Sequence, residues 1–132
     1  MPKFGTRSSG KLSECNPKLQ KLFNEVVKHF DCSILEGNRS EEKQNEYYDQ
    51  GKSKVQYPNS MHNHEPSLAV DVAPYPIDWN DKERFYFFAG FVKGIASQMD
   101  IGIRWGGDWD SDTDLHDQTF FDLPHFELKD EC

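Results

Sequence analysis

Side chains that can bind a metal ion occur at three separate places in the chain. His62 and His64 lie two residues apart, Asp71 follows inside an apolar run, and His125 comes much later. Two imidazole nitrogens and one carboxylate oxygen suit Zn²⁺ and leave a fourth coordination position for water. Asp122, three residues before His125, could approach that water as a general base. The chemistry available to this set is attack by a metal-activated water on a polar bond.

Each of these residues also has an ordinary structural interpretation. Asp71 stands between two valines and could point from a strand into solvent. A single histidine such as His125 is commonly structural or exposed. The chain contains neither an H-E-x-x-H motif nor a paired-cysteine motif, either of which would mark a zinc site by itself. Spacing alone therefore leaves the metal site open.

The hydrophobic pattern predicts an α+β scaffold for these residues. Apolar residues recur at helical spacing after Asn16, which is a suitable cap, and short apolar runs elsewhere predict strands. Polar residues gather at the predicted strand ends. The predicted helices cover Pro17 to Phe30, Ser40 toward Gly51, and a segment from Asn80 or Asp81 to Ile95; the predicted strands cover 32–35, 68–73, 101–105 and 125–128.

Length and charge limit the classes of protein to which the chain can belong. Its 132 residues suit a single domain covering 1–132. The net charge of -8 argues against nucleic acid and anionic membranes as partners. No apolar run approaches the roughly 18 to 20 residues that span a bilayer, and the N-terminal segment lacks the apolar centre of a signal peptide. We therefore expect synthesis in the cytoplasm and no membrane partner.

A second candidate cation site is an acidic loop near the C-terminal end. Asp108, Asp110, Asp112 and Asp114 occupy every second position, as carboxylates do at the start of some calcium loops. The loop lacks the glycine at the sixth position and the glutamate at the twelfth, which excludes an EF-hand. A looser Ca²⁺ site and a solvated acidic turn both remain open.

Three dispersed motifs, taken in order, resemble a known enzyme family. Their patterns are Ser-x-His, Ala-x-Asp and Asp-x-x-His-x-Glu. In this chain they are Ser60-Met61-His62, Ala69-Val70-Asp71 and Asp122-Leu123-Pro124-His125-Phe126-Glu127. The order resembles the VanY-like zinc D-alanyl-D-alanine carboxypeptidases and phage L-alanyl-D-glutamate endopeptidases, which cut peptides of bacterial peptidoglycan. Further matching segments are Phe4 to Ser8 with Leu12, Glu36 to Ser40 with Gln44, and Arg104 to Trp109.

The resemblance implies a fold and a role for each motif residue. The fold would be a single-domain zinc DD-peptidase (Hedgehog/DD-peptidase-like) fold with a small antiparallel sheet and packed helices. A histidine of the first motif, Asp71 and His125 would bind Zn²⁺, and Asp122 would be the catalytic carboxylate. Arg39 would neutralise negative charge on the substrate carbonyl, although a surface salt bridge is its ordinary alternative.

Two further residues are candidates for substrate binding. Gln44 lies about one turn along the helix that follows Arg39, where it could bind substrate or cover the pocket. Ser60 keeps the family's position two residues before the first histidine.

The chain departs from the family pattern between its first two motifs. The usual spacing is seven residues from His to Asp, which His64 keeps, whereas His62 keeps the preceding Ser60. Two extra residues in a loop have a small entropic cost, while a lost neighbour of a metal ligand is harder to replace. We therefore predict that His62 is the ligand, with His64 as the alternative.

The resemblance favours a hydrolase that is a peptidoglycan endopeptidase of the phage endolysin type, taking part in lysis and acting as a monomer. It would be made in the cytoplasm of the host bacterium and act at the periplasm or cell wall. The first alternative is D-alanyl-D-alanine carboxypeptidase activity at the same site. The second is a zinc-stabilised binding module without catalysis, against which the presence of Asp122 argues.

Overall fold

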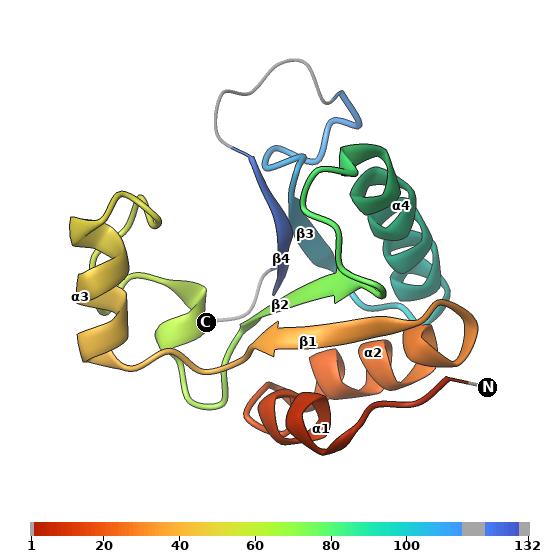
Figure 1. The fold of residues 1–132 in the computed structure, drawn as a ribbon, viewed down its shortest axis with the longest axis horizontal. Coiled ribbons are helices and arrows are strands. Elements are labelled where there is room, and N and C mark those ends of the chain that lie inside the picture. Colours follow the sequence, from red (N-terminus) through yellow and green to blue (C-terminus); the bar gives the residue numbers. More distant parts are fainter. Residues whose placement is uncertain (1, 115–120, 130–132) are drawn as a thin grey trace.

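One antiparallel sheet organises the computed structural model, which describes residues 2–114 and 121–129 (Figure 1). Two neighbouring pairs of strands are consecutive in the chain, but the last strand lies between the second and the third. The small antiparallel sheet with packed helices confirms the predicted α+β fold. In spatial order the strands are β1 (Cys32–Glu36), β2 (Ala69–Pro74), β4 (Asp122–Leu128) and β3 (Ile103–Gly106).

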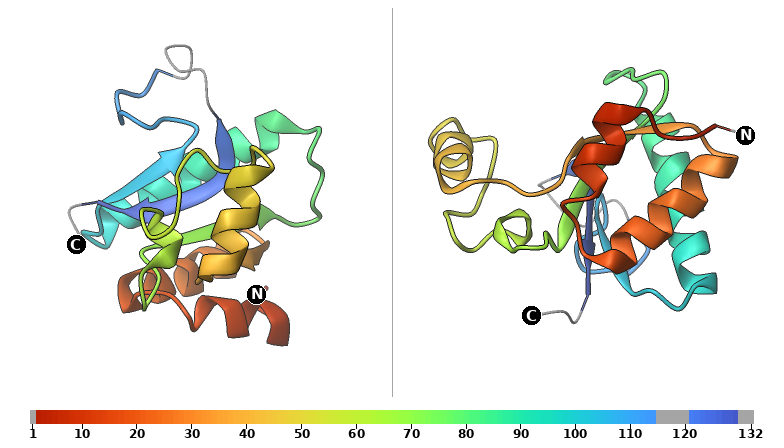
Figure 2. Two further views of the ribbon diagram at one scale, coloured as in Figure 1. Left: turned by 90° about the vertical axis from the view of Figure 1, so that its left-hand side faces the viewer. Right: turned by 90° about the horizontal axis from the view of Figure 1, so that it is seen from below.

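Helices lie on both sides of the sheet, but only one side forms the main hydrophobic core. The long helices α2 (Pro17–His29) and α4 (Lys82–Gln98) cover one face together, and α1 (Thr6–Leu12) lies against β1. Viewed from below, α3 (Glu41–Asp49) and the 3₁₀ turn η1 (Met61–Asn63) lie on the opposite side of β4 from α2 and α4 (Figure 2). The sheet thus separates an apolar layer from a more polar one.

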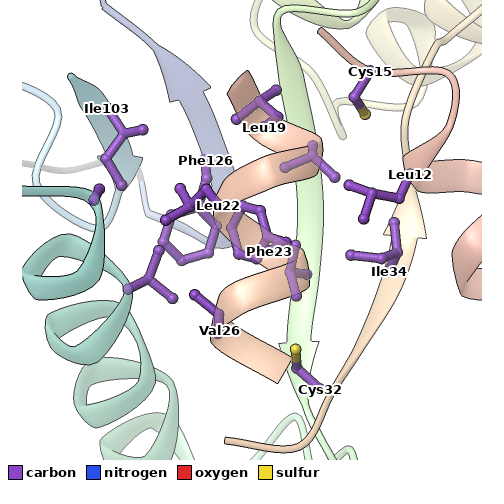
Figure 3. Packing of buried hydrophobic residues seen from close by; sticks show 14 of the residues in the cluster. Leu12, Cys15, Leu19, Leu22, Phe23, Val26, Cys32, Ile34, Ile103 and Phe126 are labelled. Carbon is purple, nitrogen blue, oxygen red and sulfur yellow. The ribbon is translucent and has the colours of Figure 1, made fainter. Parts of the chain in front are cut away.

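Apolar side chains of α2 and of the central strands form the core. Phe23 of α2 meets Phe126 of β4 edge to face, with ring centroids 5.5 Å apart, and Leu22 and Val26 lie beside them (Figure 3). Because side chains alternate across a strand, burying Phe126 against the helices turns its neighbours His125 and Glu127 to the other face.

A β-bulge brings a further carboxylate to that other face. Ile34 of β1 pairs with Val72, but the register then shifts so that Glu36, not Leu35, pairs with Asp71. An extra residue in one strand reverses the facing of all that follow it. Glu36 is therefore on the same face as Asp71.

Most element boundaries agree with the sequence predictions, and the caps are confirmed. Asn16 accepts a hydrogen bond from the backbone of Lys18, and Asp81 accepts one from the backbone of Arg84. Helix α1 was not predicted, because Leu12 is its only buried residue and it has no apolar periodicity. Strand β4 begins three residues before the predicted start. No helix among the described residues is long and apolar enough to cross a membrane.

Candidate metal and catalytic centre

Two histidines converge on one carboxylate at the polar face of the sheet. His62 Nε2 lies 3.1 Å and His125 Nδ1 lies 3.4 Å from Oδ1 of Asp71. One donor atom from each of the three residues lies within 4.8 Å of the other two. His64 is exposed and lies outside this cluster, with its backbone carbonyl accepting from Asn38.

Local structure positions each member of the cluster. His62 belongs to η1, whose first turn is capped by Ser60, because the Ser60 hydroxyl accepts from the His62 backbone N–H. Asp71 and His125 are paired residues of the neighbouring strands β2 and β4. The three donors therefore come from one capped turn and two central strands, which limits their motion.

The far nitrogen of each imidazole has a hydrogen-bond acceptor. His62 Nδ1 lies 2.8 Å from the backbone carbonyl of Gly37, and His125 Nε2 lies 2.7 Å from Oε1 of Glu127. With an N–H at each far position, the near nitrogens, His62 Nε2 and His125 Nδ1, are the ones that would offer a lone pair to a metal ion once deprotonated. Carbonyl and carboxylate partners of this kind orient metal-binding histidines and make them better ligands.

The surroundings of the cluster shift the pKa values of Asp71 and Asp122 in opposite directions. Burial alone would raise the pKa of Asp71, but His62 and His125 outweigh it and hold that pKa below its ordinary value. Burial, followed by the charge of Asp71, raises the pKa of Asp122. Burial would lower the pKa of His125, but the carboxylates of Asp71 and Glu127 raise it to about 10. Asp71 is thus held in its anionic form, while Asp122 holds a proton more readily.

Asp122 lies at the edge of the cluster. Its Oδ2 is 3.8 Å from His125 Nδ1, and its side chain is 35% exposed where that of Asp71 is 15% exposed. The close approach of strands β3 and β4 here requires a glycine, since a Cβ at Gly106 would collide with the Asp122 carbonyl. Asp122 is therefore held beside the three donors with access to the pocket.

Arg39 is buried beside the cluster, not on the surface. Its Nε and Nη2 donate to Oε1 of Glu36 at 2.9 and 2.6 Å, and Nη2 lies 3.8 Å from Oδ2 of Asp71. The guanidinium also lies over the Tyr47 ring, 4.6 Å from its centroid. The alternative interpretation of Arg39, a salt bridge on the surface, is wrong, because Arg39 forms its salt bridge with Glu36 in a buried position.

Gln44 has hydrogen bonds at both ends of its side-chain amide. Its Oε1 accepts from Arg39 Nη1 at 2.9 Å, and its Nε2 donates to the Ser53 hydroxyl and the Val55 carbonyl. Gln44 is fully buried and connects the guanidinium to the segment that follows α3. This arrangement favours the pocket-forming role over direct substrate binding.

A pocket of about 370 Å³ opens over the cluster. His62, His125 and Asp122 line it together with Ser60, and the Trp109 ring lies 5.3 Å from that of His125. Trp105 is buried. The remaining lining residues are Arg39, Lys52, Ser53, Lys54, Val55, Asn59, Met61, Arg104 and Glu127.

The acidic loop forms a separate cluster. Oxygens of Asp108, Asp110 and Asp112 lie within 4.8 Å of one another. Asp108 is buried; its Oδ2 accepts from the backbone of Thr113, and its Oδ1 has no hydrogen-bond partner in the described part of the chain. Desolvation and the nearby carboxylates raise the pKa of Asp110. Asp114 is not a member of the three-residue group.

Sequence reasoning placed the residues that support the cluster in matching segments but assigned them no role. The position of Glu127, two residues after His125, puts both on the same face of a strand. The contact between Glu36 and the cluster depends on the bulge that turns it toward Asp71. Gly37 contributes a backbone carbonyl, which no side-chain pattern reveals.

Comparison with known proteins agrees with this geometry. A family model described as phage L-alanyl-D-glutamate peptidase matches residues 1–129. The L-alanyl-D-glutamate peptidase of Escherichia phage T5 is 31% identical over 134 residues, covering 96% of this chain and 97% of that protein. The crystal structure of Serratia marcescens L-Ala D-Glu endopeptidase ChiX superposes with a TM-score of 0.76 at 27% identity, covering 96% of this chain and 89% of the other. The chain therefore belongs to the phage L-alanyl-D-glutamate peptidase family.

Proposed function

We propose that this protein is a zinc-dependent endopeptidase that hydrolyses the bond between L-alanine and D-glutamate in peptidoglycan stem peptides. The observation that carries this proposal is the convergence of His62 Nε2 and His125 Nδ1, two pocket-lining residues, on Oδ1 of Asp71. Membership of the peptidase family supplies the substrate class. Among the residues described, these three form the donor set best suited to Zn²⁺.

The donor set fits zinc in its chemistry as well as its position. Two imidazoles with oriented far nitrogens and one ionised carboxylate are three ligands, the number that catalytic zinc sites take from the protein. When bound, zinc lowers the pKa of a water ligand toward neutrality and polarises the substrate carbonyl.

The chain's own residues then divide the remaining work. Asp122, which has a raised pKa and access to the pocket, accepts the proton of the attacking water and later donates it to the departing amine. The Arg39 guanidinium stabilises negative charge that develops on the carbonyl oxygen. Gln44 and Glu36 hold Arg39 in place through hydrogen bonds to its nitrogens. Ser60 caps the turn that carries His62.

The comparisons support endopeptidase activity over the carboxypeptidase alternative. The family description and the names of the T5 and Serratia proteins all specify a bond between L-alanine and D-glutamate. We propose further that the protein acts as a monomeric endolysin, made in the host cytoplasm and active at the cell wall during phage lysis.

The direct test is product analysis with control of the metal. Purified protein is expected to contain about one Zn²⁺ per chain, three protein ligands being the usual catalytic set. Digested peptidoglycan should yield new N-terminal D-glutamate by mass spectrometry. Chelation should abolish cleavage and Zn²⁺ should restore it. Release of D-alanine instead would favour the carboxypeptidase, and full activity after complete metal removal would overturn the mechanism.

We propose that the acidic loop binds Ca²⁺ through Asp108, Asp110 and Asp112. The buried Asp108 Oδ1 supports this, because a cation would satisfy an oxygen that lacks a partner in the part of the chain described here. Calorimetry is expected to detect millimolar or tighter Ca²⁺ binding that Asp108→Asn weakens. Heat changes no larger than those of dilution would leave the loop a solvated acidic turn.

A further inference from the structure

The pocket carries cationic side chains although the protein as a whole is strongly acidic. The net charge is -8, yet Arg39, Lys52, Lys54 and Arg104 all line the pocket. The pocket also contains acidic groups, which repel an anionic substrate. The cations that are not already neutralised therefore decide whether a carboxylate can enter.

The two arginines are engaged by carboxylates of the protein. Arg39 is held by Glu36 at 2.6 Å. Arg104 donates through Nε and Nη2 to Oε2 of Glu127, at 3.1 and 2.7 Å. The contacting carboxylate offsets part of the charge of each arginine, so each attracts an incoming carboxylate less strongly than a cation without such a partner does.

Lys52 differs from the arginines in its surroundings. Among residues 2–114 and 121–129 it has no carboxylate partner, and its ammonium lies 5.5 Å from the centroid of the Tyr47 ring. Arg39 lies over the same ring. Lys52 thus extends the cationic side of the pocket outward from Arg39, with Lys54 lining the same wall.

The segment that carries Lys52 is anchored to α3. The backbone N–H groups of Lys52 and Ser53 both donate to the Tyr47 carbonyl, at 2.8 and 3.1 Å. Gln44, also in α3, donates to the Ser53 hydroxyl and the Val55 carbonyl. An anchored segment presents its charge with a smaller entropic cost on binding than a mobile one.

The proposed substrate carries a carboxylate close to the scissile bond. Glutamate has two carboxyl groups, and only one of them can continue the stem peptide. The other is a free anion unless it is amidated. It lies within the same residue as the amide nitrogen that leaves on hydrolysis, so it must be near the pocket when that bond is cleaved.

Building on the function proposed above, we infer that Lys52 binds the free carboxylate of the substrate's D-glutamate and makes the enzyme selective for stems that are not amidated there. The interaction is a charge-assisted hydrogen bond at the partly exposed rim of the pocket, so it contributes to substrate binding more than to the chemical step.

The test compares two synthetic stem peptides that differ only in whether the free carboxyl of D-glutamate is a carboxylate or an amide. The zinc-loaded protein is expected to cleave the carboxylate peptide with a kcat/KM about 5-fold higher than that for the amide peptide. This factor corresponds to the free energy of one partly exposed charge pair. Lys52→Gln should remove this preference by raising KM for the carboxylate peptide alone. Lys52→Arg should retain it. Lys21→Gln is the matched control and should leave both kcat/KM values unchanged, because Lys21 is exposed and belongs to α2, which lies on the opposite side of β4 from α3 (Figure 2).

The outcomes separate this inference from the proposed function. Cleavage of neither peptide by the parent protein would overturn the proposed function. Equal cleavage of both peptides by the parent, or an equal loss on both in Lys52→Gln, would overturn the carboxylate subsite and leave the endopeptidase intact. A preference that weakens at high salt in the parent and is absent in Lys52→Gln would support the subsite.

Discussion

At the scale of single residues, Asp122 distinguishes catalysis from metal binding. It lies outside the three-donor cluster, and its Oδ2 is 3.8 Å from His125 Nδ1. We predict that Asp122→Ala keeps its zinc while hydrolysis falls by about 10²–10⁴-fold, the usual contribution of a general base. Metal analysis and peptide digestion on the same preparation would measure both. Loss of zinc in the variant would make Asp122 a ligand instead, and a parent protein that binds stem peptides without cleaving them would favour the inactive module.

The two histidines of the first motif give the second prediction. His62 is buried with its Nε2 facing Asp71, whereas His64 is exposed. His62→Ala should therefore lose zinc and activity, and His64→Ala should keep both close to the parent values. Circular dichroism would establish that each variant is folded. Full zinc content in His62→Ala would show that the prediction from Ser60 was wrong.

Site residues could be identified from the sequence where the chemistry allows only a few residue types. They could not be identified where their role depends on the geometry of the fold. His62, Asp71 and His125 are visible in the sequence because few side chains bind zinc, and the structure brings those three together. Glu36 and Gly37 lie in a matching segment, but they act through a bulge and a backbone carbonyl, and neither role can be inferred from residue type. Gln44 was identified, but its hydrogen bonds to Arg39 and Val55 depend on tertiary packing.

At the scale of elements, α1 packs closely against Gly37, whose carbonyl contacts His62 of the proposed metal centre. A Cβ at Gly37 would collide with the Lys11 carbonyl of α1, and backbone cannot move aside easily. We predict that Gly37→Ala lowers the free energy of unfolding by about 1–3 kcal/mol. It should also weaken zinc binding about 10-fold, because the Gly37 carbonyl orients His62. Thermal unfolding and a zinc competition titration would measure the two effects.

Gly94 is the matched control for that substitution. It lies in α4, is exposed, and a Cβ there meets nothing within 4 Å. Gly94→Ala should raise the free energy of unfolding by about 0.5–1 kcal/mol, because alanine favours the helix, and should leave zinc binding unchanged. Equal effects at both positions would contradict the special role of Gly37.

Elements with a strong apolar pattern were predicted, and elements held by their neighbours were not. Helix α2 begins at the predicted Pro17, because its buried leucines, valines and phenylalanine repeat at helical spacing. Helix α1 buries only Leu12, and η1 is a single capped turn around His62. Such elements form because the rest of the fold gives them a surface, so their local sequence carries little signal.

At the scale of the whole molecule, the two faces of the sheet have different roles, one in the hydrophobic core and one at the candidate site. One face buries the apolar side chains of α2 and α4, and the other gathers His62, Asp71 and His125 under the pocket. A net charge of -8 gives little long-range attraction to an anionic wall, so capture depends on local charges such as Lys52.

Stability as a function of pH should reveal the coupling of the cluster to the fold. The pKa of Glu127 is lowered, because its bonds to His125 and Arg104 outweigh burial, and that of Asp71 is lowered as well. Groups with a lowered pKa stabilise the fold above their ordinary values, 4.5 and 3.8 here, and that stability is lost as the pH falls below them. His125 has a raised pKa, so its contribution is complete below 6.5 and is lost as the pH rises through about 10.

Chelator-treated protein should therefore be most stable between about pH 5 and 6.5, with the midpoint of thermal unfolding falling on both sides. Zinc should remove the alkaline decline, because the metal takes the place of the proton on His125 Nδ1 and stabilises the deprotonated form. Scanning calorimetry from pH 3 to pH 9, with chelator and with Zn²⁺, measures both curves. His125→Asn serves as the control and should show no alkaline decline attributable to this group. Identical curves with and without zinc would mean that the metal does not bind at His125.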